Sequence, residues 1–287
     1  MNINEHMHTP TNNSLATEVK VPVHRMRHPY LAIAVVSMIG MFGIFAFLAQ
    51  HALPGSSLYG FKTNTLQTLG EKSNATPQEK AQYQITHMEN RLAEVKKLTT
   101  QKIVSQKAQD ALFALMQQHQ KELFASINMA NSGITEQNAL SLLVRFESVT
   151  GAIEILSKRS PALQDFNNNV YDLHSENERV ISEKVDRFVE KETLPNIFTF
   201  ISDQLAQVTA QLKNSQTSEE TLHDAQKYID MIGDALTHSD FPKAINEINL
   251  ATQLLQIENY TGILKPITAI TPFTQDNHSS TTASTTR

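Results

Sequence analysis

The residues of this chain that could bind a pair of metal ions are few. Glu220 and His223 have the Glu-x-x-His spacing with which helical bundles hold two metals. Such a site needs a second element of this kind and two further inward carboxylates. The nearest match, at His87, has Gln84 where a carboxylate would be required. Glu220 also completes a capping box, Thr217-Ser218-Glu219-Glu220, so we interpret it as part of a helix start and predict no metal centre.

Other ionisable residues fit ordinary surface roles. Asp230, Asp234 and His238 recur every four residues, which places them on one helical face, offset from the apolar stripe and therefore expected to face solvent. His6 and His8 lie in a polar segment where we expect no chelation. The chain has no cysteine to serve as a nucleophile or metal ligand, and neither a zinc-protease helix nor a serine elbow. The sequence predicts no catalytic residue and no cofactor, and hence no enzyme.

The composition excludes further classes. Lys and Arg number 24 against 29 Asp and Glu in 287 residues, a formal net charge of −5, so nucleic acid is not an expected partner. Nine glycines are few for a phosphate-binding loop, a dinucleotide fold or a sheet with many tight turns. A helical protein is the class that remains.

One segment has the character of a membrane span. Leu31 to Ala49 is uncharged, and ten of its residues are Leu, Ile, Val or Phe, contributing about −3 to −6 kcal/mol on an insertion scale. As a helix it would rise about 28 Å, close to the hydrocarbon thickness. The exit offers no pair of small residues for cleavage, so we expect an uncleaved signal anchor over residues 31–50, with a cleaved signal as the alternative.

Charges on either side of this segment predict its orientation. Lys20, Arg25 and Arg27 precede it, whereas the first cation after it is Lys62. The positive-inside bias therefore keeps residues 1–30, a tail expected to be disordered, in the cytoplasm. We expect a single-pass protein of the cell membrane that contacts the lipid bilayer and has an extracytoplasmic C-terminal domain.

Beyond the span, helix signals follow one another. Pro77, Pro161 and Pro242 stand at first turns, Thr76 and Glu79 form a capping box, and seven apolar stripes with helical spacing run from Ala81 to Leu255. No segment alternates with a period of two. We predict an all-α fold, in which the transmembrane helix is followed by a multi-helix antiparallel bundle or array over 76–264. The Ser/Thr-rich residues 265–287 are expected to be disordered.

Residues 51–75 connect the predicted span to the helices and carry a motif. Its six residues are Leu53, Pro54, Gly55, Leu58, Tyr59 and Lys62. Pro54 and Gly55 suit the centre of a type II turn, and a short amphipathic helix can follow as far as Gly70. Tyr59 and Lys62 are candidate anchors at the level of the lipid headgroups. We interpret the segment as a turn that leads the chain from membrane to domain, and a recognition site made of the same residues is the alternative.

This motif resembles a bacterial membrane-anchored family known only as a domain of unknown function. Its members carry a Leu-Pro-Gly-Asp-x-Leu-Tyr-x-x-Lys signature just after a signal or membrane segment, and an Arg-Leu-x-Glu element in the next helix. The six motif residues fit, as does Arg91-Leu92-Ala93-Glu94, while Ser56 replaces the Asp. The resemblance implies a bacterial, envelope-exposed helical module without catalytic residues. Some relatives occur in anti-sigma or sigma-regulatory settings, but the short, cysteine-free tail here departs from a zinc-binding anti-sigma domain.

The sequence leaves several functions open. A large exported helical domain without an assembled reactive group favours an interaction module, for sensing or scaffolding, that binds an unknown envelope protein or a second copy of itself. A structural stalk is the main alternative. A membrane-tethered enzyme with a site built from distant helices, or an anti-sigma-type regulator, is a further one.

Overall fold

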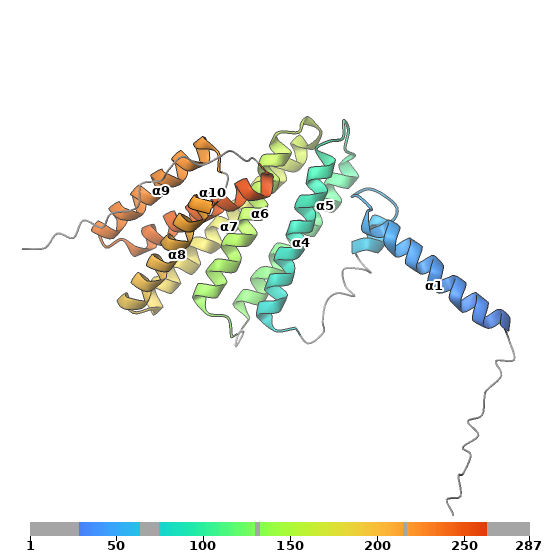
Figure 1. The fold of residues 1–287 in the computed structure, drawn as a ribbon, viewed down its shortest axis with the longest axis horizontal. Coiled ribbons are helices and arrows are strands. Elements are labelled where there is room, and N and C mark those ends of the chain that lie inside the picture. Colours follow the sequence, from blue (N-terminus) through green and yellow to red (C-terminus); the bar gives the residue numbers. More distant parts are fainter. Residues whose placement is uncertain (1–28, 64–74, 130–132, 215–216, 263–287) are drawn as a thin grey trace, which may run out of the picture. The chain divides into compact units, whose positions relative to one another are not determined.

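The computed structural model describes residues 29–63, 75–129, 133–214 and 217–262, and these contain helices, turns and loops but no strand (Figure 1). The all-α class is therefore confirmed. The helices are α1 (Pro29–Gln50), α2 (Tyr59–Phe61), α4 (Pro77–Leu98), α5 (Gln106–Asn128), α6 (Glu136–Lys158), the 3-10 turn η2 (Pro161–Leu163), α7 (Gln164–Lys191), α8 (Leu194–Asn214), α9 (Glu219–Thr237) and α10 (Phe241–Thr261). The chain divides into two compact units at residues 47 and 48.

Helix α1 contains the predicted span. Most of the large apolar side chains described in it are exposed, namely Val35, Val36, Met38, Ile39, Met41, Phe42, Ile44, Phe45, Phe47 and Leu48. Within the described residues, no helix meets the combined requirement of length and apolarity for crossing a membrane. The side chains of residues 31–34, where the predicted span begins, lie outside the described residues, as do residues 1–28 of the predicted tail 1–30 and the whole of the predicted tail 265–287. Residues 29 and 30, predicted to belong to the first tail, are the first residues of α1.

Capping side chains start the helices of the second unit. Thr76 accepts a hydrogen bond from the backbone N–H of Glu79 (3.2 Å), and the Glu79 carboxylate accepts one from the N–H of Thr76 (2.8 Å), which confirms the predicted capping box of α4. The predicted box at α9 is wrong by one residue. Ser218 is the N-cap there, with Thr221 as its partner (3.2 Å), so Glu220 is an acidic residue of the first turn and no capping-box member.

Helices that are neighbours in the sequence pack against each other, and α10 also contacts helices that are distant from it in the sequence. Helix α4 packs on α5 and α6, α6 packs on α7, and α9 and α10, which follow each other in the sequence, pack together as a helical hairpin. Helix α10 then contacts α6, α7 and α8 as well as α9, and in Figure 1 it lies among them. At Gly151 of α6 an added Cβ would lie 2.7 Å from Cδ1 of Ile257 on α10, so the two helices approach closely there.

The predicted apolar stripes supply the core between these helices. Its largest fully buried apolar side chains are Ile85, Met88, Leu98, Leu112, Met116, Leu123, Leu140, Leu143, Phe146, Ile153 and Phe166. Several polar side chains are nevertheless buried among them, and they form the sites described next.

Candidate functional site

The motif at residues 53–62 begins with a tight turn. The N–H of Ser56 donates to the carbonyl of Leu53 (3.1 Å), and Gly55 has a φ of +87°, as a type II turn with Pro54 and Gly55 at its centre requires. A Cβ on Gly55 would also lie 3.0 Å from Cβ of Ala108. Both the backbone conformation and the close approach to α5 therefore demand glycine here.

The turn directs Tyr59 and Lys62 onto α4, where they meet Arg91 and Glu94. The phenol of Tyr59 donates to Oε2 of Glu94 (2.7 Å) and accepts from Nη1 of Arg91 (2.7 Å). Nζ of Lys62 lies 2.5 Å from Oε1 of Glu94 and donates to the carbonyl of Ala52 (3.2 Å). Arg91 is fully buried, and its Nη2 lies 3.4 Å from Glu94. We call these four residues the Tyr59 cluster.

The Tyr59 cluster has one carboxylate for two cations. Burial raises the pKa of the Tyr59 phenol above its ordinary value, an effect that Arg91 opposes and Glu94 supports, so the phenol stays protonated and can donate. Tyr59 is only 5% exposed. The interpretation of Tyr59 as a headgroup anchor is therefore wrong, because its hydroxyl group forms hydrogen bonds with Arg91 and Glu94 inside the helical unit. The ammonium group of Lys62 likewise binds Glu94 and Ala52.

Two buried histidines meet between α4 and α5: His87 lies one turn before Arg91 on α4, and His119 belongs to α5. The rings of His87 and His119 stack with centroids 4.9 Å apart and an interplanar angle of 8°, and Nδ1 of His119 donates to Oε1 of Gln84 (2.9 Å). Burial, together with the charge of Arg91, lowers the pKa of His87 to about 4 and that of His119 to about 3. Both rings are neutral at pH 7 and act as packing groups. The described residues contain no group of three or more candidate metal ligands.

A second polar cluster joins α6 to α7. The carboxylate of Glu147, which is almost fully buried, binds Nδ1 of His174 and accepts a hydrogen bond from Nδ2 of Asn177 (2.6 Å). Gln120 of α5 donates to Oδ1 of Asn177 (2.8 Å). Burial raises the pKa of Glu147 to about 7, and the bond to Glu147 raises that of His174 to about 9. The hydroxyl of Thr150 beside them donates to the carbonyl of Phe146 (3.1 Å), so this cluster is a structural ion pair without an available nucleophile.

We expect the free energy of unfolding of a Glu147→Gln variant to change less between pH 6.5 and 9.5 than that of the wild type. The bond of His174 to Glu147 stabilises the fold fully below the unfolded pKa of 6.5 and is lost as the pH rises through about 9. The raised pKa of Glu147 changes stability only between the unfolded pKa of 4.5 and about 7, so nearly all of the difference above pH 7 comes from His174. His174 is partly exposed, so we discount the effect for screening to about 1–2 kcal/mol.

Urea unfolding, followed by circular dichroism at pH 6.5 and at pH 9.5, measures the free energy of unfolding of wild type and variant. Glu183→Gln, which removes an exposed carboxylate of α7, is the control and should follow the wild type. If the free energies of unfolding of wild type and Glu147→Gln changed equally with pH, the assignment of Glu147 and His174 as a stabilising pair would be contradicted.

The residues singled out in the sequence for metal chemistry are not brought together. Glu220, His223, Asp230, Asp234 and His238 are all exposed. The exposure of Asp230, Asp234 and His238 confirms the predicted solvent-facing row, in which Asp234 lies 3.6 Å from His238 and 3.9 Å from Lys243. His6 and His8 lie outside the described residues.

Sequence reasoning missed the cluster around Glu147, although a signal was present. Glu147 follows Phe146 and stands two residues before Val149 on the apolar stripe of α6, and a carboxylate in that position needs a buried partner. Comparisons of the chain with protein-family models, with curated proteins and with solved structures found no match.

Proposed function

We propose that this chain is a single-pass protein of a bacterial cell membrane, anchored by its N-terminal helix, whose helical domain binds another envelope component outside the cytoplasm. The charge-free run from Leu31 to Ala49 and the basic residues before it support the anchor and its orientation. The exposed apolar side chains of α1 suit contact with lipid. The juxtamembrane signature supports membership of the domain-of-unknown-function family that it resembles.

The observation that carries this proposal is the Tyr59 cluster. Tyr59 and Lys62 come from the first element of the signature, and Arg91 and Glu94 come from the second, 32 and 35 residues from Tyr59. Hydrogen bonds and ion pairs join the two elements. A signature whose two parts bind each other is best explained as a joint that fixes the segment after the anchor onto the first long helix of a domain.

The same contacts favour the turn over the recognition site as the role of the motif. Tyr59 is buried, and the ammonium group of Lys62 is bound to Glu94 and Ala52. Side chains bonded in this way offer little to a partner. We therefore place recognition on the helical domain and assign to the motif the task of holding that domain in position.

Protease treatment of spheroplasts tests the topology. We expect added protease to digest residues 75–262 of the full-length chain while an epitope tag at the N-terminus stays protected. Spheroplasts lysed before treatment serve as the control, in which the tag must also be lost. Protection of the helical domain in intact spheroplasts would overturn the proposed orientation.

Cross-linking in the envelope tests the interaction. We expect capture of the tagged full-length chain, followed by mass spectrometry, to recover one envelope component reproducibly. A chain with Glu94→Met, which we expect to be destabilised, is the control that should lose this component. Recovery of the bait alone would contradict the proposal and favour a structural stalk, and cross-links between copies would identify self-association.

A further inference from the structure

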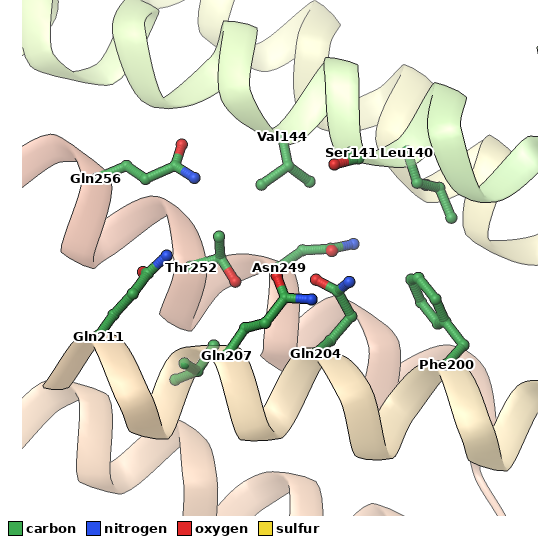
Figure 2. Close-up of a pocket in the computed structure, with 11 residues that line it drawn as sticks. Leu140, Ser141, Val144, Phe200, Gln204, Gln207, Gln211, Asn249, Thr252 and Gln256 are labelled. Atoms are coloured by element: carbon green, nitrogen blue, oxygen red, sulfur yellow. The ribbon is translucent and has the colours of Figure 1, made fainter. Parts of the chain in front are cut away.

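A pocket lined largely by side-chain amides lies between α6, α8 and α10 (Figure 2). Its volume is about 70 Å³, several times the 10–15 Å³ needed by one water molecule. Three glutamines of α8, Gln204, Gln207 and Gln211, rise toward it in Figure 2, and Asn249 and Gln256 reach it from α10. The remaining lining residues are Leu140, Ser141, Val144, Phe200, Val208 and Thr252.

Two amide atoms of this pocket have no hydrogen-bond partner among the described residues. Nδ2 of Asn249 and Oε1 of Gln256 are both buried and unpaired, and Asn249 as a whole is only 6% exposed. A buried polar group left unpaired costs about 1–3 kcal/mol. One of these atoms is a donor and the other an acceptor, so an occupant that pairs with both must itself accept and donate.

The lining also restricts the charge of an occupant. None of the described residues that form the pocket is ionisable. A charged group would be desolvated there without a counter-charge, which is unfavourable. The pocket therefore suits a neutral ligand that combines N–H or O–H donors with carbonyl or hydroxyl acceptors.

Peptide backbone fits these conditions better than a neutral sugar. A side-chain amide can pair with a backbone amide through both its C=O and its NH₂ group. The row from Gln204 to Gln211 and the row from Asn249 to Gln256 each cover seven helical steps, about 10.5 Å, which matches about three residues of extended chain. The one aromatic side chain of the lining, Phe200, is 5% exposed and packs on Phe188 (centroids 4.8 Å apart), so it offers no open platform for a sugar ring.

We propose that the pocket formed by α6, α8 and α10 binds about three residues of a neutral, extended peptide segment of a partner protein by pairing side-chain amides with its backbone. This inference rests on the proposed interaction function and assigns it a site. Backbone pairing supplies affinity in other modes of strand-like peptide recognition, in which side-chain pockets add specificity.

Peptide titration with an Asn249→Leu variant tests the assignment. Heptapeptides selected from a random library on the purified full-length chain would be synthesised and titrated by fluorescence anisotropy. We expect at least tenfold weaker binding to Asn249→Leu. Gln118→Leu, which changes an exposed glutamine on α5, should bind within twofold of the wild type. Leucine has the same branched side-chain skeleton as asparagine, its larger methyl groups border the open pocket, and it removes an unpaired buried amide atom, so the variant should unfold at the same temperature as the wild type or higher.

The outcomes separate this inference from the proposed function. Equal affinity of selected peptides for wild type and Asn249→Leu, or a library that yields no binder, would overturn the peptide site. So would weakened binding of a neutral trisaccharide, maltotriose, by Asn249→Leu in the absence of any peptide effect. If Asn249→Leu still captures the same envelope component by cross-linking, the interaction function stands and only the site is wrong.

Discussion

Replacing Glu94 with methionine is expected to lower the free energy of unfolding by about 3–5 kcal/mol, the usual cost of breaking a buried ion pair from one side. The substitution leaves the fully buried guanidinium of Arg91 and the ammonium of Lys62 without a counter-ion, and the Tyr59 phenol without its acceptor. Urea unfolding of the full-length chain, followed by circular dichroism, measures the loss.

Replacing Arg91 with methionine, alone and together with Glu94→Met, tests whether the loss is caused by the unpaired charge. Arg91→Met alone leaves Lys62 and Glu94 as a neutral pair, with Tyr59 still able to donate to Glu94, so we expect a smaller loss of about 1–2 kcal/mol. The double variant Arg91→Met, Glu94→Met should be more stable than Glu94→Met, because it removes the buried unpaired cation. Losses that simply add in the double variant would show that packing, and not charge pairing, is what Glu94 provides.

Lysines at Ile39 and Phe42 are expected to release the chain from the membrane fraction. Each lysine near the centre of a span costs about 2.5–3.5 kcal/mol on the insertion scale, and with the apolar residues lost the pair costs about 6–8 kcal/mol. This exceeds the about −3 to −6 kcal/mol that the apolar residues of Leu31 to Ala49 contribute. Insertion should therefore become unfavourable.

Carbonate extraction followed by immunoblotting measures this release. Ile39→Leu with Phe42→Leu keeps both positions apolar, and this control should remain in the pellet. Retention of the double-lysine variant in the extracted membrane would show that α1 is not the anchor.

Local sequence signals predicted that these helices occur, but they did not identify the first residue of every helix. Thr76, Pro77 and Glu79 act within one turn, so the start of α4 is readable from neighbouring residues alone. At α9 two adjacent hydroxyl residues, Thr217 and Ser218, both suit an N-cap, and sequence spacing does not decide between them. At Pro161 the predicted start became the 3-10 turn η2, and α7 begins at Gln164.

The sites were less predictable because they depend on contacts between distant helices. The signature named Tyr59, Lys62, Arg91 and Glu94, but their mutual pairing follows from the packing of residues 53–62 on α4, which no local pattern encodes. Without that packing, the polar tips of Tyr59 and Lys62 fitted a membrane interface equally well. The glutamines of α8 resemble any polar helix face, and α10 has to lie beside them before they line a pocket.

The position of α10 has a consequence for the way the domain is made. Helix α6 is complete at Lys158, yet the helix that covers its Gly151 side ends only at Thr261, about 100 residues later. At the 5–20 residues per second of protein synthesis, this interval lasts about 5–20 s. Until α10 has been made, the apolar face of α6, and those of α7 and α8 once these helices have been made, are open to other chains. We therefore expect the nascent domain to depend on a holding chaperone until its final described helix has emerged.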